Sequence, residues 1–302
     1  MKCFIAIPTY NGGIIWQKTA YNIKEYAPEN TFVQVIDSGS SDNTVEIAKR
    51  AGFDVVGIPS KEFNHGDTRN NAVNTNIDKF DIVIFLTQDA IPSPGFIENI
   101  LKVFTDQSVA CAYGRQLPHI DANPIAEHAR IFNYPEVSHI CDRSSANAMG
   151  LKSVFMSNSF SAYRLSIFKE LGGFPNDTIL CEDMYFAAKA ILAGYKSAYV
   201  ASAVVQHSHN YSPIEEFKRY FDIGVFHADQ PWIKREFGSA GSEGMKFIVS
   251  EMKYISITRL KWLAKSAINN LMKILGYKIG SKYIILPKTI IKKFSMHRGY
   301  WK

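Results

Sequence analysis

The chain has 302 residues, of which 46% are hydrophobic and 21% charged, so it can bury the core of one large domain and has the composition of a globular protein. Its net charge of +6 is unevenly distributed. Residues 246–302 carry 13 Lys and Arg against one Glu, whereas the rest of the chain carries 21 basic and 27 acidic residues. An acidic body argues against a nucleic-acid-binding protein.

Cysteine usage and hydropathy predict a cytoplasmic protein. The four cysteines show no CxxC spacing, which argues against a zinc ribbon and a disulfide framework and fits a reducing compartment. The N-terminus lacks a basic-then-apolar leader, and no apolar run approaches the roughly 18 residues that span a bilayer.

Short apolar, β-branched runs alternate with helical spacing through the first hundred residues. Strands are predicted at Cys3–Ile7, Thr31–Ile36, Phe53–Ile58 and Asp81–Thr87, and helices at Asp42–Arg50, Thr68–Asn76 and from Ser93 and Pro94 onward. Such alternation predicts right-handed βαβ units in a Rossmann-like α/β fold with a mostly parallel sheet flanked by helices. Ligands of such sheets bind beyond the carboxyl ends of the strands.

Residues 115–150 break this alternation and are rich in His, Asn, Pro and Ser. We expect this segment to line the site or to contact an acceptor. Regular structure resumes with a strand at Phe160–Tyr163, helices at Ser166–Leu171 and Glu182–Leu192, and a strand at Tyr195–Val205.

Asp89 follows the most strand-like run of the chain, residues 81–87. A carboxylate there lies at the ligand edge of the sheet and suits a hard divalent cation that holds phosphates. The alternative is that Asp89 only caps the turn before Pro92.

Two further loops carry groups that suit a nucleotide. Asp37 can accept hydrogen bonds from a base, and Gly39 lets the backbone approach a ligand, although the same loop also reads as a capping turn. The loop with His65 and Arg69 combines a flexible turn with a cation, and its alternative is an ordinary Asn/Gly loop.

Glu182 and Asp183 open a helix, whose N-terminus favours negative charge and keeps a carboxylate ionised for use as a base. Charge complementarity at the helix end is the alternative. His207 and His209 follow a strand, and we expect one of them, rather than both, to be a metal ligand because their spacing does not suit a helical zinc pair.

The ordered set of motifs resembles the inverting family-2 glycosyltransferases of the GT-A fold over roughly residues 3–230. The motifs are Ile7-Pro8-Thr9-Tyr10-Asn11, the run from Asp37 to Thr44, Thr87-Gln88-Asp89-Ala90, Gly172-Gly173-Phe174 and Glu182-Asp183. The resemblance implies a catalytic domain at 1–230, with a nucleotide-sugar half (about 1–114) and an acceptor half (about 115–230). A basic, amphipathic helical region follows at 231–302.

The resemblance also implies roles for single residues. Asp183 would be the catalytic base, and Asp89 would hold Mg²⁺ or Mn²⁺ with His207, or with His209 instead. Thr87 departs from the family pattern, because it stands where the first Asp of Asp-x-Asp is expected, and this puts a ribose or metal contact in doubt. The donor-binding set is expected to be Pro8, Thr9, Tyr10, Asp37, Gly39, His65, Arg69, Gln88 and Glu182.

Three longer sequence segments make the resemblance more specific. They are similar to segments of bacterial rhamnosyltransferases that use dTDP-β-L-rhamnose to build surface polysaccharides such as O-antigen. The three segments are residues 63–70, 86–90 and 207–212. A lipid-linked glycan is then the expected acceptor. One alternative is a glycosyltransferase that uses another nucleotide sugar. The others are a sugar nucleotidyltransferase and an inactive carbohydrate-binding homologue. Segment 9–13 is a poor match to the Gly-rich loop of a nucleotidyltransferase.

The basic tail interleaves Lys and Arg with an apolar helical face formed by Leu260, Leu263, Ala267, Leu271 and Ile274. Such a helix suits an anionic membrane interface and would make the protein peripheral on the inner face of the cytoplasmic membrane. The alternative is a helical pair packed on the catalytic domain or on a second subunit of a homodimer.

Overall fold

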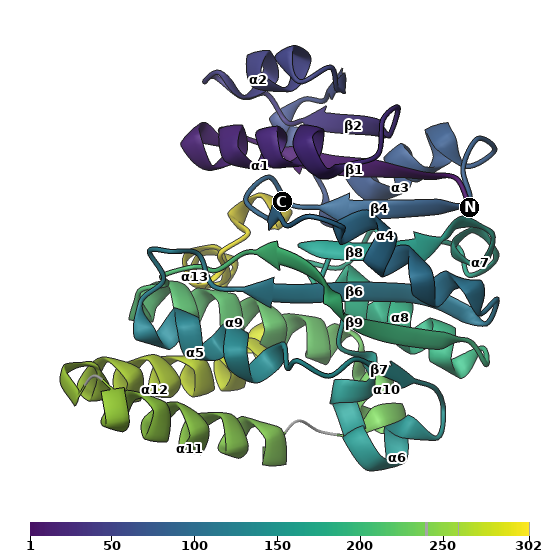
Figure 1. Cartoon of the computed structure of the whole chain (residues 1–302). Helices are drawn as coiled ribbons and strands as arrows, with labels where there is room; N and C mark the ends of the chain where they lie inside the picture. Colours follow the sequence, from purple (N-terminus) through teal and green to yellow (C-terminus); the bar gives the residue numbers. More distant parts are fainter. Residues whose placement is uncertain (239–240, 259, 302) are drawn as a thin grey trace.

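A single sheet forms the centre of the molecule (Figure 1). The computed structural model describes residues 1–238, 241–258 and 260–301. In this part of the chain the sheet has nine strands, with β7 (His139–Cys141) paired to β9 beside the main path. That path runs in the order β3 (Asp54–Gly57), β2 (Phe32–Asp37), β1 (Cys3–Thr9), β4 (Ile82–Leu86), β8 (Phe160–Arg164), β6 (Val109–Leu117), β9 (Lys196–Gln206) and β5 (Ile91–Pro92).

Most strands point the same way. β1 to β4 are mutually parallel, and β8 runs antiparallel between β4 and β6, so β6 and its parallel neighbour β9 point in the direction of β4. The carboxyl ends of these six strands therefore meet at one edge of the sheet. The predicted α/β fold with a mostly parallel sheet is confirmed.

Helices cover both faces of this sheet, and alternate residues of β1 enter the two separate cores. Ile5 packs with Trp16 of α1 (Gly13–Tyr26) and Phe96 of α4 (Phe96–Leu101). Phe4 enters the opposite core, which is filled from α7 (Leu165–Glu170), α8 (Glu182–Leu192), α9 (Pro213–Asp229) and α10 (Pro231–Phe237). The strands are covered on both sides, which explains their continuous apolar runs.

The remaining helices are short or lie at the periphery. They are α2 (Thr44–Arg50), α3 (His65–Asn76), α5 (Pro124–Asn133), α6 (Ser145–Met149), α11 (Gly241–Thr258), α12 (Leu263–Gly280) and α13 (Lys288–Phe294).

Three local expectations differ from the structure. The helix expected to open at Ser93 and Pro94 begins at Phe96, because the Ser93 N–H donates to Val204 O of β9 (3.0 Å) and Gly95 makes the turn with φ +72°. Residues 115–150, where regular structure was expected to be interrupted, include the end of β6 and all of α5, β7 and α6. The loop after β1 is followed directly by α1, a helix that the sequence pattern did not predict.

The basic tail is helical, and α12 packs closely along α9. Gly276 and Gly280 make this crossing tight, since a Cβ on them would lie 2.3 Å from Phe217 O and 2.0 Å from Phe221 O. A backbone approach this close requires glycine. Within the described residues, no helix is both long and apolar enough to cross a membrane.

The α9–α12 crossing makes a test of stability. We expect Gly280→Ala to lower the free energy of unfolding by about 1–3 kcal/mol, because the added methyl group must displace the backbone of Phe221. Gly244→Ala in α11 is the matched control, because a Cβ there meets open space. Urea unfolding followed by circular dichroism should show a lower midpoint for Gly280→Ala and an unchanged or higher midpoint for Gly244→Ala. Equal midpoints would contradict the tight crossing.

Candidate active site

One carboxylate and two imidazoles converge at the carboxyl edge of the sheet. Asp89 follows β4, and His207 and His209 follow β9, where the His207 N–H donates to Leu117 O at the end of β6 (2.8 Å). Asp89 Oδ2 lies 3.5 Å from His207 Nε2 and 3.7 Å from His209 Nε2. One ligand atom from each residue lies within 4.8 Å of the others. The structure therefore places both histidines, and not only the one expected, where they can share a metal ion with Asp89.

Gln116 on β6 determines which nitrogen of His207 carries a proton. Its Nε2 donates to Ser157 Oγ (2.7 Å), which turns its Oε1 toward Arg130 and toward His207 Nδ1 (2.8 Å). Because Oε1 can only accept, His207 Nδ1 must donate, and a neutral His207 then presents the lone pair of Nε2 to Asp89. An outer hydrogen bond of this kind is what orients metal-binding histidines.

The charges of this cluster favour a cation at its centre. Burial opposes ionisation of Asp89, but His207 and His209 in their protonated forms hold the pKa of its carboxyl well below the usual range, so Asp89 is ionised at any pH at which the imidazoles are neutral. Burial lowers the pKa of His207, and burial with the adjacent His207 lowers the pKa of His209 to about 3. At neutral pH a carboxylate thus faces two uncharged imidazoles, and the donor set of one oxygen and two nitrogens fits a divalent metal ion.

Asp183 is the second residue of α8, and Asn158, just before β8, contacts it. Its two oxygens accept from the backbone N–H groups of Asn158 (3.0 Å) and Met184 (2.7 Å). Burial and the adjacent charge of Glu182 outweigh these bonds and raise the pKa of Asp183 to about 7. The expectation that the helix N-terminus keeps this carboxylate ionised is therefore corrected: near neutral pH, Asp183 can hold or release a proton.

Glu182 has a different environment from its neighbour. It is buried, and its Oε1 lies 3.1 Å from Arg69 Nη1 and accepts from Asn158 Nδ2 (2.9 Å). Arg69 also donates to His65 O (2.9 Å) and stacks over Phe85 at 5.8 Å. The structure thus places Arg69 in a buried ion pair, where it neutralises Glu182 beside Asp183.

The C-terminal segment contacts His65, whose backbone carbonyl accepts from Arg69 of this ion pair. His297 Nδ1 lies 3.4 Å from His65 Nε2, and Asp222 of α9 holds the segment by accepting from Met296 N (2.9 Å) and His297 N (3.2 Å). Burial, with the nearby charge of His297, lowers the pKa of His65 to about 4. The described chain therefore ends beside the carboxyl edge of the sheet (Figure 1).

A second group of predicted residues lies at the ends of β1 and β2. Thr9 Oγ1 donates to Asp37 Oδ1 (3.1 Å), and the other Asp37 oxygen accepts from Gly39 N (3.0 Å) and Ser40 N (2.8 Å). Gly39 has φ +84°, a conformation that favours glycine. The loop thus holds the Asp37 carboxylate in a fixed orientation.

Gln88 joins this group to the metal-binding cluster. Its Oε1 accepts from Tyr10 N (2.8 Å), and its Nε2 donates to Tyr10 O (3.0 Å). Pro8 lies in β1 opposite Ile36, and the Tyr10 side chain is exposed at the end of that strand. The loops after β1 and β4 are therefore fixed to one another directly beside Asp89.

Sequence reasoning missed Gln116 and two arginines near the cluster. Arg130 donates to Gln116 Oε1, and Arg219 of α9 is exposed and lies over the Tyr211 ring at 5.9 Å. The charges of both arginines lower the pKa of His209, behind the larger effects of burial and of His207. No local pattern identifies these residues, because each reaches the cluster from a distant element.

Comparisons with known proteins agree on one family. The model described as glycosyl transferase family 2 matches residues 4–172. The sequence is 50% identical to O-antigen chain rhamnosyltransferase RfbN of Salmonella typhimurium, covering 100% of this chain and 96% of that protein. It is 46% identical to O-antigen chain rhamnosyltransferase WbaN of Salmonella anatum, covering 98% and 95%.

A solved structure shares the fold. Mannosyltransferase PcManGT from Pyrobaculum calidifontis, in complex with GDP-Man and Mn²⁺, superposes with a TM-score of 0.64 at 16% sequence identity. The match covers 92% of this chain and 87% of that one.

The cluster at Asp89 predicts a hierarchy of metal affinities. Asp89→Asn should abolish most Mn²⁺ binding, because it removes the only charge among the three ligands. Gln116→Leu should weaken binding by about 10- to 100-fold by freeing the His207 tautomer. Electron paramagnetic resonance titration of free Mn²⁺ measures both, with the exposed Asp78→Asn as control. Unchanged affinity in Asp89→Asn would exclude this cluster as the site.

Proposed function

The chain belongs to glycosyl transferase family 2 and is a glycosyltransferase, and from this premise we propose that it transfers L-rhamnose from dTDP-β-L-rhamnose to a hydroxyl of a glycan. The observation that carries the proposal is identity of 50% and 46%, across essentially the whole chain, to two O-antigen chain rhamnosyltransferases. The acceptor is accordingly proposed to be a lipid-linked glycan of bacterial surface polysaccharide synthesis.

The loops after β1 and β2 are proposed to bind the nucleoside. Asp37 is held by Thr9 and by the backbone of Gly39, so its carboxylate is preorganised to accept from a base N–H. The Thr87 hydroxyl is buried beside the Asp89 carboxylate and makes no hydrogen bond of normal geometry with a described residue. A donor hydroxyl is the proposed partner of this group, which stands where the family pattern has an acid.

The donor diphosphate is proposed to lie between Asp89 and α9. Asp89, His207 and His209 would hold Mg²⁺ or Mn²⁺, which neutralises the diphosphate and makes it a better leaving group. Arg219 is proposed to add a second positive charge, since it forms no ion pair with a described residue and its charge reaches His209.

Asp183 is proposed to act as the base. In its ionised form it removes the proton of the acceptor hydroxyl while that oxygen attacks the anomeric carbon from the face opposite the diphosphate. A single displacement inverts the configuration, so a β-linked donor gives an α-linked product. The buried Glu182–Arg69 pair positions α8 and sets the pKa of the base through the charge of Glu182.

The raised pKa of Asp183 predicts the pH dependence of the reaction. Because the base acts when ionised, kcat/KM should fall as pH drops through about 7 and level off above it. Asp183→Asn should lower kcat by about 10²- to 10⁴-fold with donor affinity unchanged. Steady-state rates from pH 5.5 to 8.5 and donor titration calorimetry measure the two effects, with Asp177→Asn, five residues before α8 begins, as control. Turnover within a few-fold of the parent would exclude Asp183 as the base.

Donor choice separates the proposal from its alternatives. Release of dTDP with glycan acceptor should be fastest with dTDP-β-L-rhamnose, and chelation with EDTA should remove the activity. Faster turnover of another nucleotide sugar would show that the donor is not dTDP-β-L-rhamnose. Formation of a nucleotide sugar from a nucleoside triphosphate would favour a nucleotidyltransferase, and binding without turnover would favour an inactive carbohydrate-binding homologue.

A further inference from the structure

Helix α12 presents its apolar side to solvent and its polar side to the protein. Buried residues on α12 include Ser266, Asn269, Asn270 and Lys273. A soluble helix normally buries its apolar stripe. The opposite, exposed side carries Ala267, Ile268, Leu271, Ile274 and Leu275. The side chain of Leu260, the first residue of the predicted apolar face, lies outside the described part of the chain.

Specific contacts hold α12 in this orientation. Lys273 lies 3.4 Å from Glu216 of α9, and both side chains are buried. Glu251 of α11 accepts from Ser266 Oγ (2.8 Å) and from Asn270 Nδ2. Rotating the helix to bury Leu271 would break these bonds and expose buried charges. Together with the Gly276 and Gly280 contacts, they fix the apolar side outward.

Helix α11 adds a second apolar stripe beside the first. Met245, Val249 and Met252 are exposed on one side, while Phe247 packs on His128 of α5 at 5.1 Å between ring centroids. α11 and α12 run side by side at the end of the molecule opposite α2 (Figure 1). The exposed residues of both helices, with Ile284 and Ile285 after α12, are here named the α11–α12 face.

Basic residues outnumber acidic ones around this face. The exception is Glu243 in the first turn of α11, which is half-buried and pairs with Lys246 and Lys152. Residues 244–302 contain one acid, Glu251, and it is buried. A hollow of about 620 Å³ combines Met245 and Val249 with Lys246 and Lys253.

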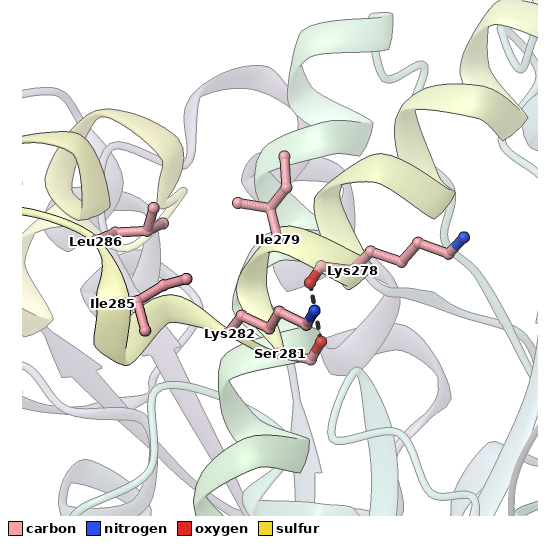
Figure 2. Close-up of a pocket in the computed structure, with 6 residues that line it drawn as sticks. All are labelled: Lys278, Ile279, Ser281, Lys282, Ile285 and Leu286. Carbon is pink, nitrogen blue, oxygen red and sulfur yellow. Dashed lines mark hydrogen bonds between the residues drawn. The ribbon is translucent and has the colours of Figure 1, made fainter.

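A second hollow, of about 590 Å³, lies where the chain turns after α12. It combines Ile279, Ile285 and Leu286 with Lys278 and Lys282. In Figure 2 the Lys278 side chain extends away from Ile285 and Leu286, so the ammonium lies outside the apolar lining. Apolar side chains ringed by ammonium groups match the acyl and phosphate parts of an anionic lipid.

We propose that the α11–α12 face docks on the surface of an anionic lipid bilayer. The inference deepens the proposed function and rests on it in one respect, since a lipid-linked acceptor lies at such a surface. A second copy of the chain is a poorer occupant, because a symmetric contact would bring the same lysines together.

Vesicle flotation of the full chain tests the docking directly and uses neither donor nor acceptor. The protein should float with vesicles of phosphatidylcholine and phosphatidylglycerol in equal parts and stay unbound with phosphatidylcholine alone. The triple variant Ile268→Asn, Leu271→Gln, Leu275→Gln should lower the partition coefficient by at least tenfold, as should Lys278→Glu with Lys282→Glu.

Matched controls replace exposed residues of the catalytic body whose apolar side chains are at least as exposed as those of the variant. Ile14→Asn, Val137→Asn and Leu192→Gln remove three scattered apolar side chains, and Lys18→Glu with Lys24→Glu reverses two charges on α1. These controls should bind like the parent. Absence of flotation with anionic vesicles, or equal loss in the controls, would overturn the proposal, and so would a parent dimer in sedimentation that the triple variant dissociates.

The outcome is separable from the proposed chemistry. If the donor or acceptor were wrong, flotation would be unaffected. If docking were wrong, rates with a water-soluble acceptor would be unaffected and flotation would fail. The triple variant should keep its rate with that soluble acceptor within about twofold of the parent.

Discussion

The site depends on one electrostatic constraint: the carboxylate of Asp89 lies 3.5 and 3.7 Å from two imidazole nitrogens that burial keeps uncharged. The fold creates this constraint by carrying β4 and β9 to the same edge of the sheet, although β8 and β6 separate them. The bond between Gln116 and His207 directs a lone pair at the carboxylate. A bound cation would offset the repulsion among these acceptor atoms, and the phosphates of the sugar donor would supply further oxygen ligands to it.

A second constraint sets the chemistry at α8. Two adjacent carboxylates open the same helix, and the structure gives them opposite environments. Glu182 is paired with Arg69 and stays charged. Among the described residues Asp183 accepts from backbone donors alone, and the charge of Glu182 raises its pKa. Separating two acids in this way yields one structural anion and one group that can exchange a proton near neutral pH. The C-terminal segment completes this region by placing His297 against His65.

Residues that end apolar strands could be predicted from sequence, because parallel strands deliver them to one edge; Asp89 and His207 are of this kind. Gln116 and His297 could not, since their partners lie 91 and 232 positions away and no local pattern specifies such pairs. The spacing of apolar residues predicted the apolar side of α12, but it did not predict that this side faces solvent. That direction is set by Gly276, Gly280 and the Lys273–Glu216 pair, which are contacts with α9.

The protonation of His207 tests the central constraint most directly. Nitrogen-15 NMR of the imidazoles, without added metal at pH 7, distinguishes the two neutral tautomers from the imidazolium. We predict a neutral His207 with its proton on Nδ1 and a large shift of the Nε2 resonance when Mg²⁺ is added. A His207 that is protonated on Nε2, or doubly protonated and paired with Asp89 as a simple salt bridge, would contradict the account.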